Sequence, residues 1–405
     1  YYCKGKQPWM HDEEGVGCSK PLRGSLRSAS NVYFPSVKSS IYLPRTDASV
    51  PDELLQILEA PRVSAIINQF IRGQHLELLT PEFVRSLDGY ALDGYSDEQI
   101  KTALIYLAEG NPQPKDKGDV VDREPEVAFR REEFNVLVQK WDDDELKVEP
   151  QELSRYEKWV SNYFSKIALV PKLRETRVLT GFTRVLPEND LTMEQKRRLL
   201  WATEPRQKWL PAYVIHGEGI LFVLDEAKLT NWESRKDVLE RLTPLISNFE
   251  HMSSVRGYSS KEISPRFVLL HTFAHLLINR LTFDCGYSSA SLRERLYVSN
   301  NQAAPMAGVL IYTAAGDSEG TMGGLVRMGK PGYLEPVVRR ALESAMWCSA
   351  DPVCMEMGGA GGQGPDSCNL AACHSCALVP ETACEEFNRF LDRALLVGSF
   401  NNPGI

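Results

Sequence analysis

The sequence predicts the α+β fold class, as a multidomain chain of mixed helices with a small sheet and a knotted C-terminal domain. Three observations support this prediction. Long apolar segments have helical spacing, short apolar runs typical of buried strands lie between them, and the two kinds do not alternate strictly, as a doubly wound sheet would require. At 405 residues the chain is also too long for one compact core, so we expect two or three domains.

The domains are expected as consecutive segments of the chain. Polar and proline-bearing residues at 111–126 predict a linker, because they interrupt the apolar spacing found on either side. The predicted segments, in order, are 1–50, an irregular remnant of a longer N-terminal region; 51–110, a helical region; 111–126, the linker; 127–262, a mixed α/β middle domain; and 263–405, the C-terminal domain.

Composition narrows the class of protein. An apolar content of 43% and a charged content of 25% are ordinary for a globular chain, and no run of eighteen apolar residues predicts a membrane span. Nine unevenly spread cysteines argue against a secreted disulfide scaffold and favour the reducing cytoplasm. The net charge of −8 means that any contact with DNA needs a local basic patch. The chain opens on Tyr-Tyr-Cys without a signal peptide, and we expect its true N-terminus to lie upstream.

Three elements are predicted from local residue patterns. The run Ala212–Asp225 predicts two buried strands that meet in a hairpin at Gly217–Gly219. Ser264-Pro265 is typical of a helix start, and Arg266–Phe283 is apolar on nearly all sides, which indicates a central, buried helix. Residues 385–397 place their apolar side chains on one stripe and predict an amphipathic helix.

The central helix carries two histidines, His271 and His275, four residues apart and therefore on one face. The spacing resembles the zinc-binding helix of metalloproteases, but Thr272 stands where those enzymes place the glutamate base. We interpret both as core histidines satisfied by local hydrogen bonds. A catalytic zinc pair and other functional contacts are the alternatives.

A second motif, Gly324–Lys330, matches seven positions of the phosphate-binding loop G-x-x-x-x-G-K-[ST]. The eighth position is Pro331, which supplies neither a hydroxyl group for Mg²⁺ nor a backbone N–H for phosphate. We therefore expect no ATP binding by this chain on its own.

Four cysteines near the C-terminus predict a metal site. Cys368, Cys373, Cys376 and Cys384 fall within seventeen residues, and a Cys-x-x-Cys turn presents two sulfurs to one ion without backbone strain. We expect one structural Zn²⁺, so that segment 263–405 becomes a zinc-binding domain with a zinc-knotted fold. Disulfides and unrelated buried thiols are the alternatives to zinc. Two further cysteines flank Asp351-Pro352 and could join the site in place of Cys368: Cys348 and Cys354.

Three segments of the chain resemble one protein family. Residues 271–297, 310–327 and 368–398 are similar to the DrmB subunit of the bacterial antiphage system DISARM, and the C-terminal part resembles the zinc-binding domain that also ends MrfA-like DNA-repair helicases. The resemblance implies that the chain partners a DrmA-like helicase subunit of the DEAD/DEAH type, and that the two together engage DNA.

The first functional hypothesis is therefore a non-catalytic, zinc-binding subunit of a helicase complex that helps to bind DNA. Phosphate contacts would come from basic side chains in an otherwise acidic chain, and a solvated surface is the alternative for each of them. The candidates are Arg293, Arg295, Arg327 and Lys330.

The second hypothesis is a metal-dependent nuclease or hydrolase that uses His271, His275 and a carboxylate such as Asp284 or Asp317. A site with four thiolates argues against it, because such a site is closed and leaves no coordination position for water.

Overall fold

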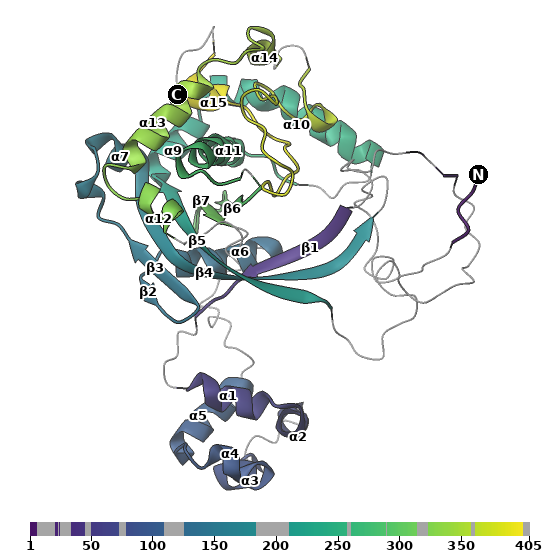
Figure 1. Cartoon of the computed structure of the whole chain (residues 1–405), viewed down its shortest axis with the longest axis vertical. Helices are drawn as coiled ribbons and strands as arrows, with labels where there is room; N and C mark the ends of the chain where they lie inside the picture. The colour runs from purple at the N-terminus through teal and green to yellow at the C-terminus, as the bar shows by residue number, and fades with distance from the viewer. Residues whose placement is uncertain are drawn as a thin grey trace. The chain divides into compact units, whose positions relative to one another are not determined.

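The computed structural model describes most of the chain in two compact units (Figure 1). One unit comprises Tyr1–Leu43 with Glu124–Ile405, and the other comprises Pro44–Arg123. The described residues are 1–5, 21–22, 24, 34–44, 50–72, 78–108, 125–183, 210–256, 261–288, 290–313, 323–357 and 361–399. Among them, no helix has the length and hydropathy to cross a membrane.

The smaller unit is helical and has its own core. Apolar side chains at helical spacing, such as Leu54, Leu58 and Ile67, pack together in its interior. The guanidinium of Arg85 joins two of its helices by donating to the carbonyl oxygens of Leu92 and Tyr95. Its helices are α1 (Asp52–Glu59), α2 (Pro61–Arg72), α3 (Pro81–Leu87), α4 (Gly89–Leu92) and α5 (Asp97–Ala108).

The larger unit is built on one antiparallel sheet. In the described residues its strand order is β2-β3-β4-β5-β7-β6, and β1 pairs with the far part of β4. The predicted α+β class is therefore confirmed: the strands form one antiparallel sheet, and the helices lie outside it. The strands are β1 (Phe34–Ile41), β2 (Trp141–Asp142), β3 (Leu146–Pro150), β4 (Phe164–Thr183), β5 (Ala212–Leu224), β6 (Leu292–Ser299) and β7 (Met306–Thr313).

Successive residues of the central strands point into two different cores. Ile220 and Phe222 belong to the larger core, whereas Leu221 belongs to the smaller one, as the two-residue period of a strand requires. The smaller core is closed by α6 (Pro125–Leu137). The larger core is closed by helices that cover the opposite face of the sheet (Figure 1). These are α7 (Lys158–Tyr163), α9 (Glu226–Glu233), α10 (Lys236–Arg256), α11 (Pro265–Cys285), α12 (Gly324–Met328) and α13 (Leu334–Ala345).

The central helix α11 forms as predicted. Its first turn is capped by Ser264, whose hydroxyl oxygen accepts a hydrogen bond from Phe267 N, and Pro265 occupies the first helical position. It ends at Gly286, which adopts the left-handed conformation common after a helix. Between these ends nearly every side chain from Arg266 to Ile278 is buried.

The predicted hairpin at Gly217–Gly219 is wrong, because β5 continues through both glycines. Gly219 is in register with Val170 of β4 and with Tyr312 of β7. A Cβ atom at Gly217 would lie 2.5 Å from the carbonyl oxygen of Thr313. The glycines therefore allow close approach of a neighbouring backbone, and they do not mark a turn.

The expected boundary between segments 127–262 and 263–405 does not divide the structure. β5 from the first segment pairs with β7 from the second, and both segments contribute to the larger core. A chain break at residue 262 would therefore cut through one sheet, and the two segments form one folding unit.

The C-terminal segment 361–399 contains little regular structure. The predicted helix over 385–397 is wrong: only α15 (Ala394–Val397) is helical there, and Phe387, Asn388 and Phe390 have positive φ angles. Most of the apolar stripe is nevertheless buried, with Phe390 and Leu391 fully inside the larger core, whereas Phe387 is exposed. This segment also includes η5 (Pro365–Ser367), and it follows the short helix α14 (Val353–Glu356). Because this segment has few helical or sheet hydrogen bonds of its own, side-chain contacts have to hold it in place.

Candidate metal centre

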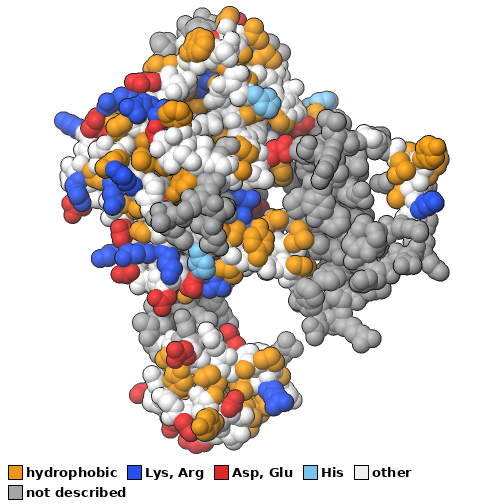
Figure 2. All heavy atoms as spheres, viewed as in Figure 1, with side chains coloured by type: hydrophobic (Ala, Val, Ile, Leu, Met, Phe, Trp, Pro, Cys, Tyr) orange, Lys and Arg blue, Asp and Glu red, His pale blue; other side chains and the backbone are white. Residues whose placement is uncertain are grey.

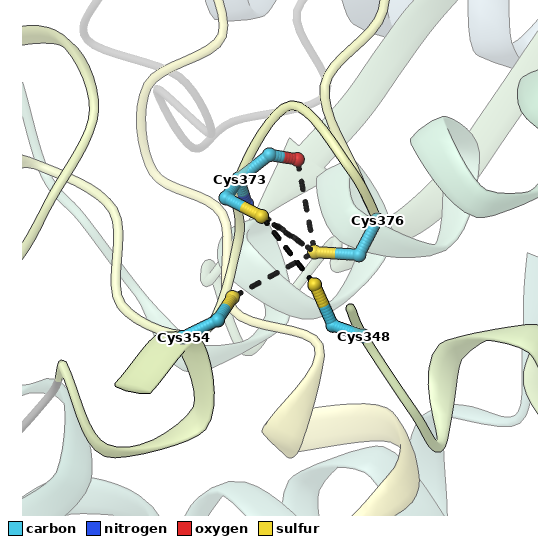
Figure 3. Close-up of side chains that lie close together, drawn as sticks. All are labelled: Cys348, Cys354, Cys373 and Cys376. Carbon is cyan, nitrogen blue, oxygen red and sulfur yellow. Dashed lines mark hydrogen bonds between the residues drawn. The ribbon is translucent and has the colours of Figure 1, made fainter. Parts of the chain in front are cut away.

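Four cysteine side chains converge at the start of the C-terminal segment (Figure 3). Cys348 lies in the turn after α13, Cys354 lies in α14, and Cys373 and Cys376 lie on one tight turn. The Sγ atoms of Cys348 and Cys373 are 3.5 Å apart, those of Cys354 and Cys376 are 3.8 Å apart, and those of Cys373 and Cys376 are 3.7 Å apart.

These distances fit a tetrahedral zinc ion. A Zn–S bond of about 2.3 Å puts the sulfurs of a tetrahedron about 3.8 Å from one another. A disulfide would bring two sulfurs to about 2.05 Å, and the described cysteines form none. The four-cysteine cluster therefore has the ligand type, the number and the spacing of a structural zinc site.

Hydrogen bonds around the cluster favour thiolates. Ala350 N donates to Cys348 Sγ at 3.4 Å, Cys373 N donates to Cys376 Sγ at 3.3 Å, and Gln363 Nε2 lies 3.5 Å from Cys354 Sγ. Such second-layer donors orient metal-binding sulfurs and stabilise their negative charge.

A buried cation lies beside the same sulfurs. The Arg393 guanidinium is fully buried, donates to the carbonyl oxygen of Ala345 at 2.6 Å and forms an ion pair with Asp351. Burial alone lowers the pKa of Arg393, but Asp351 and the thiols of Cys376 and Cys354 together raise it. Its positive charge partly offsets the two negative charges that four thiolates leave on a divalent ion.

In the absence of a bound cation, the thiols of Cys354 and Cys376 share a hydrogen bond and therefore differ in acidity. The hydrogen bond from Cys376 lowers the pKa of Cys354 to about 5, and the same bond raises the pKa of Cys376. Such a pair binds a divalent cation by releasing its remaining protons.

The comparisons with known proteins agree with this geometry. A protein-family profile, the MrfA Zn-binding domain, matches residues 273–377, a range that contains all four cysteines of the cluster. The DISARM protein DrmB of Bacillus paralicheniformis is 32% identical over 412 aligned residues, which cover 99% of this chain and 69% of that protein. The chain belongs to the DrmB family. It therefore contains a zinc-binding domain and is related to components of the DISARM system.

In this DrmB-family chain, only two of the four predicted ligands lie together. Cys373 and Cys376 are in the four-cysteine cluster, as the Cys-x-x-Cys spacing predicts, but Cys348 and Cys354 take the places expected for Cys368 and Cys384. Cys368 Sγ lies 3.4 Å from the carbonyl oxygen of Asp366, outside the four-cysteine cluster, and Cys384 Sγ lies 3.2 Å from His271 Nε2. From the sequence, Cys348 and Cys354 are expected only as replacements for Cys368, and the structure brings both of them into the cluster.

The predicted phosphate contacts divide into buried and exposed residues. Arg295 is 1% exposed, and its guanidinium donates to Glu133 Oε1 and Oε2 at 2.6 Å and to Ser39. Contrary to the prediction, Arg295 is therefore unavailable to a phosphate in this structure. Arg293 is half-buried on β6, whereas Arg327 and Lys330 are exposed.

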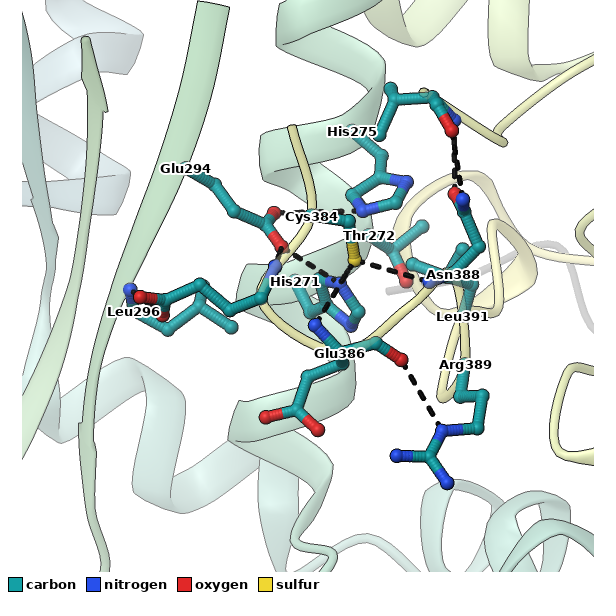
Figure 4. Close-up of polar contacts among 12 residues, drawn as sticks. His271, Thr272, His275, Glu294, Leu296, Cys384, Glu386, Asn388, Arg389 and Leu391 are labelled. Carbon is teal, nitrogen blue, oxygen red and sulfur yellow. Dashed lines mark hydrogen bonds and ion pairs between the residues drawn. The ribbon is translucent and has the colours of Figure 1, made fainter. Parts of the chain in front are cut away.

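The two histidines of α11 are fully buried, but their contacts are not local. His271 and His275 lie beside Glu294 of β6 and Cys384 of the C-terminal segment (Figure 4). Of the carboxylates considered for a hydrolase, Asp284 pairs with Arg280, and Asp317 lies outside the described residues. The buried carboxylate of Glu294 was missed, although a charged residue within an apolar strand pattern is a signal for such a contact.

Proposed function

We propose that this chain is a non-catalytic, zinc-stabilised subunit of a cytoplasmic antiphage defence complex. The four-cysteine cluster in a chain of the DrmB family carries the proposal. Four thiolates fill a tetrahedral coordination shell, so the ion there has no open position for a reacting water. One zinc ion at this cluster would hold the C-terminal segment in place and would take no part in turnover.

Adenosine triphosphate would be hydrolysed by a partner, a DrmA-like helicase subunit of the DEAD/DEAH type. Gly324–Lys330 is the motif that resembles a phosphate-binding loop. Backbone N–H groups at the start of α12 already bind a carboxylate there. Glu218 Oε1 accepts from Leu325 N at 2.9 Å, and Glu218 Oε2 accepts from Gly323 N at 2.9 Å. These backbone N–H groups are the ones that a phosphate would need. Because these N–H groups already donate to Glu218, they are not available to a phosphate, which supports an accessory role for this chain.

The same region offers a basic surface for DNA. Tyr156 donates its hydroxyl hydrogen to the carbonyl oxygen of Gly329 at 2.7 Å, and Arg339 pairs with Glu157, so the chain before α7 lies against α12 and α13. Figure 2 shows Lys and Arg side chains over this region, with acidic side chains between them. We define the α12–α13 basic surface by its exposed members Arg155, Lys158, Arg327, Lys330, Arg339 and Arg340.

Within this surface, Arg327 and Lys330 are the preferred phosphate contacts. Arg327 lies in the last turn of α12, and Lys330 lies two residues beyond its end. The hydrogen bond and the charge of Arg327 lower the pKa of the neighbouring Tyr333, and the charge of Lys330 lowers it less strongly. The Arg327 guanidinium lies over the Tyr333 ring, 4.9 Å from its centroid, which holds the charge at the surface. Half-buried Arg293 is proposed as a weaker contact.

The experiment is DNA binding by the complex of this chain with its helicase partner, measured by fluorescence anisotropy over a series of salt concentrations. The double variant Arg327→Ala/Lys330→Ala should weaken binding and reduce the slope of log affinity against log salt by about 2, one for each lost phosphate contact. The charge-matched control Arg62→Ala/Lys101→Ala changes two exposed residues of the smaller unit and should leave the slope unchanged. An unchanged slope in the first variant would exclude this surface.

The burial of the two histidines argues against the hydrolase alternative. His271 and His275 are each 0% exposed, so a substrate does not reach them in this structure. Incubation of the purified chain with DNA and Mg²⁺, Mn²⁺ or Zn²⁺ should produce no cleavage. Cleavage that disappears in a His275→Ala variant would overturn the proposed accessory role.

A further inference from the structure

A second group of metal-ligand side chains lies in the larger core, outside the four-cysteine cluster. It consists of His271, His275, Glu294 and Cys384, and one ligand atom from each lies within 4.8 Å of the others. Figure 4 shows the four side chains pointing toward one another from α11, from β6 and from the C-terminal segment. His271, His275 and Glu294 are 0% exposed, and Cys384 is 8% exposed. We call these residues the His-Glu-Cys cluster.

The hydrogen bonds of His275 leave a lone pair directed into this cluster. His275 Nδ1 lies 2.8 Å from the carbonyl oxygen of Ala377, and because a carbonyl only accepts, Nδ1 carries the hydrogen. A neutral imidazole ring with its hydrogen on Nδ1 has a bare lone pair on Nε2. Among the described residues, His275 Nε2 and Glu294 Oε2 have no hydrogen-bond partner, and they lie 3.6 Å from each other.

Two buried acceptors that face each other are unfavourable unless a cation lies between them. Glu294 is fully buried, and one of its carboxylate oxygens, Oε2, faces His275 Nε2. Its other oxygen, Oε1, lies 3.0 Å from His271 Nε2. The carboxylate thus directs both of its oxygens at imidazole nitrogens.

The sulfur of Cys384 is also placed as a ligand. Cys384 Sγ lies 3.2 Å from His271 Nε2 and accepts from the backbone N–H groups of Glu386 at 3.3 Å and Asn388 at 3.2 Å. Two backbone donors on one sulfur stabilise a thiolate.

The geometry does not fit a catalytic Cys-His-Glu triad. In a triad the histidine uses one ring nitrogen for the nucleophile and the other for the carboxylate. Here the same atom, His271 Nε2, is the neighbour of both Cys384 Sγ and Glu294 Oε1. Three ligand atoms that approach one another in this way are arranged as they would be around a common cation.

We propose that the His-Glu-Cys cluster binds a second structural zinc ion, held by His271, His275, Glu294 and Cys384. Imidazole nitrogen, carboxylate oxygen and thiolate sulfur are all zinc ligands, and four of them close a tetrahedral shell. Two neutral imidazoles, one carboxylate and one thiolate leave a divalent ion with no net charge, which suits a site without water. The ion would join α11, β6 and the C-terminal segment at one point.

The test is the zinc content and coordination of the full chain, purified without chelators. Elemental analysis should give two zinc ions per chain, and X-ray absorption at the zinc edge should give a mixed shell. Four sulfurs at one site and one at the other average to about 2.5 sulfurs per ion, with the remainder nitrogen or oxygen at about 2.0–2.2 Å. One ion per chain in an all-sulfur shell would overturn the proposal, and so would a metal other than zinc.

Substitutions in the His-Glu-Cys cluster test which residues bind the second ion. Glu294→Gln keeps the side-chain shape but removes the charge, and His275→Gln removes the ring nitrogen. Each should lower the content from two ions to one and leave an all-sulfur shell. The control His251→Gln changes an exposed histidine of α10 and should retain both ions. Two ions in both cluster variants would contradict the assignment, and if the variants do not fold, the result for the unaltered chain decides.

Discussion

His275 donates its Nδ1 hydrogen to the carbonyl oxygen of Ala377 across 2.8 Å, and Ala377 directly follows Cys376 of the four-cysteine cluster. One histidine of the central helix therefore belongs to the His-Glu-Cys cluster and also contacts the backbone next to a cysteine of the four-cysteine cluster. Its Nε2 atom lies in the His-Glu-Cys cluster, and its Nδ1 atom positions the Cys-x-x-Cys turn. A contact of this kind with the backbone beside a ligand helps to orient that ligand, here Cys376.

Removal of metal should loosen the C-terminal segment selectively. A structural zinc site contributes roughly 10–16 kcal/mol of apparent binding free energy, and a whole domain is stable by about 5–15 kcal/mol. After treatment with a chelator, hydrogen exchange should increase over residues 361–399 and at His271–His275. The helices α1 and α5 of the smaller unit are the internal control, because their core is separate. Unchanged exchange over 361–399 would show that zinc does not hold this segment.

The four-cysteine cluster predicts which cysteines matter for zinc. Cys354→Ser should reduce the zinc content by one ion, because it removes a sulfur of the cluster. Cys368→Ser should retain the metal, since its sulfur lies outside both groups. Cys285→Ser is the control, because Cys285 is half-buried at the end of α11 and is also outside both groups. Loss of zinc in Cys368→Ser with retention in Cys354→Ser would support the ligand set expected from spacing alone.

The buried ion pair between Arg295 and Glu133 should contribute strongly to the free energy of unfolding and should not contribute to DNA binding. Arg295→Met leaves Glu133 buried without its partner, and such a change costs about 3–5 kcal/mol in the free energy of unfolding. Arg293→Ala, two residues away on the same strand, is the comparison and should cost clearly less. Chemical denaturation measures both values. A neutral Arg295→Met would mean that Arg130, which lies 3.7 Å from Glu133, satisfies this carboxylate together with Tyr297 and the backbone N–H of Ile41.

Tyr312 should make the protein less stable at alkaline pH. Burial, and next the neighbouring Glu175, raise the pKa of Tyr312 to about 12, and its hydroxyl lies 3.0 Å from Glu175 Oε1. Above pH 10 the unfolded chain releases this proton while the folded chain retains it. The contribution of Tyr312 is therefore complete below about pH 10 and falls by about 1.4 kcal/mol per pH unit up to about pH 12.

The check compares the free energy of unfolding of the unaltered chain with that of Tyr312→Phe between pH 8 and pH 11. The unaltered chain should lose stability more steeply, and the difference isolates Tyr312 from other groups that titrate in this range. Parallel curves would contradict the raised pKa of Tyr312.

Local patterns in the sequence are enough to predict some of these features. The helix α11 follows from a long apolar run with a Ser-Pro start, because both signals lie within the helix itself. The pairing of Cys373 with Cys376 is equally local. The family could be identified from short segments because they carry specific residues at close spacing, such as the cysteines and the region around Glu294.

Features that depend on distant residues could not be predicted. Gly217 and Gly219 resemble a turn in sequence, since the approach of Thr313 is visible only in the sheet. Cys348 lies beside Cys373, which follows 25 positions later in the sequence, and the path of the chain between them decides which thiols meet. The stripe around Phe390 is buried without a helix, because contacts of Asn388 with the backbone of Val379 set the local conformation.

The central claim is that zinc holds the C-terminal segment through Cys348, Cys354, Cys373 and Cys376. The most direct measurement is an anomalous difference map from crystals of the full chain, with data collected on both sides of the zinc absorption edge. The account predicts a strong peak at the centre of these four sulfurs that disappears below the edge. A map with no peak there, or a peak beside Cys368 instead, would contradict it.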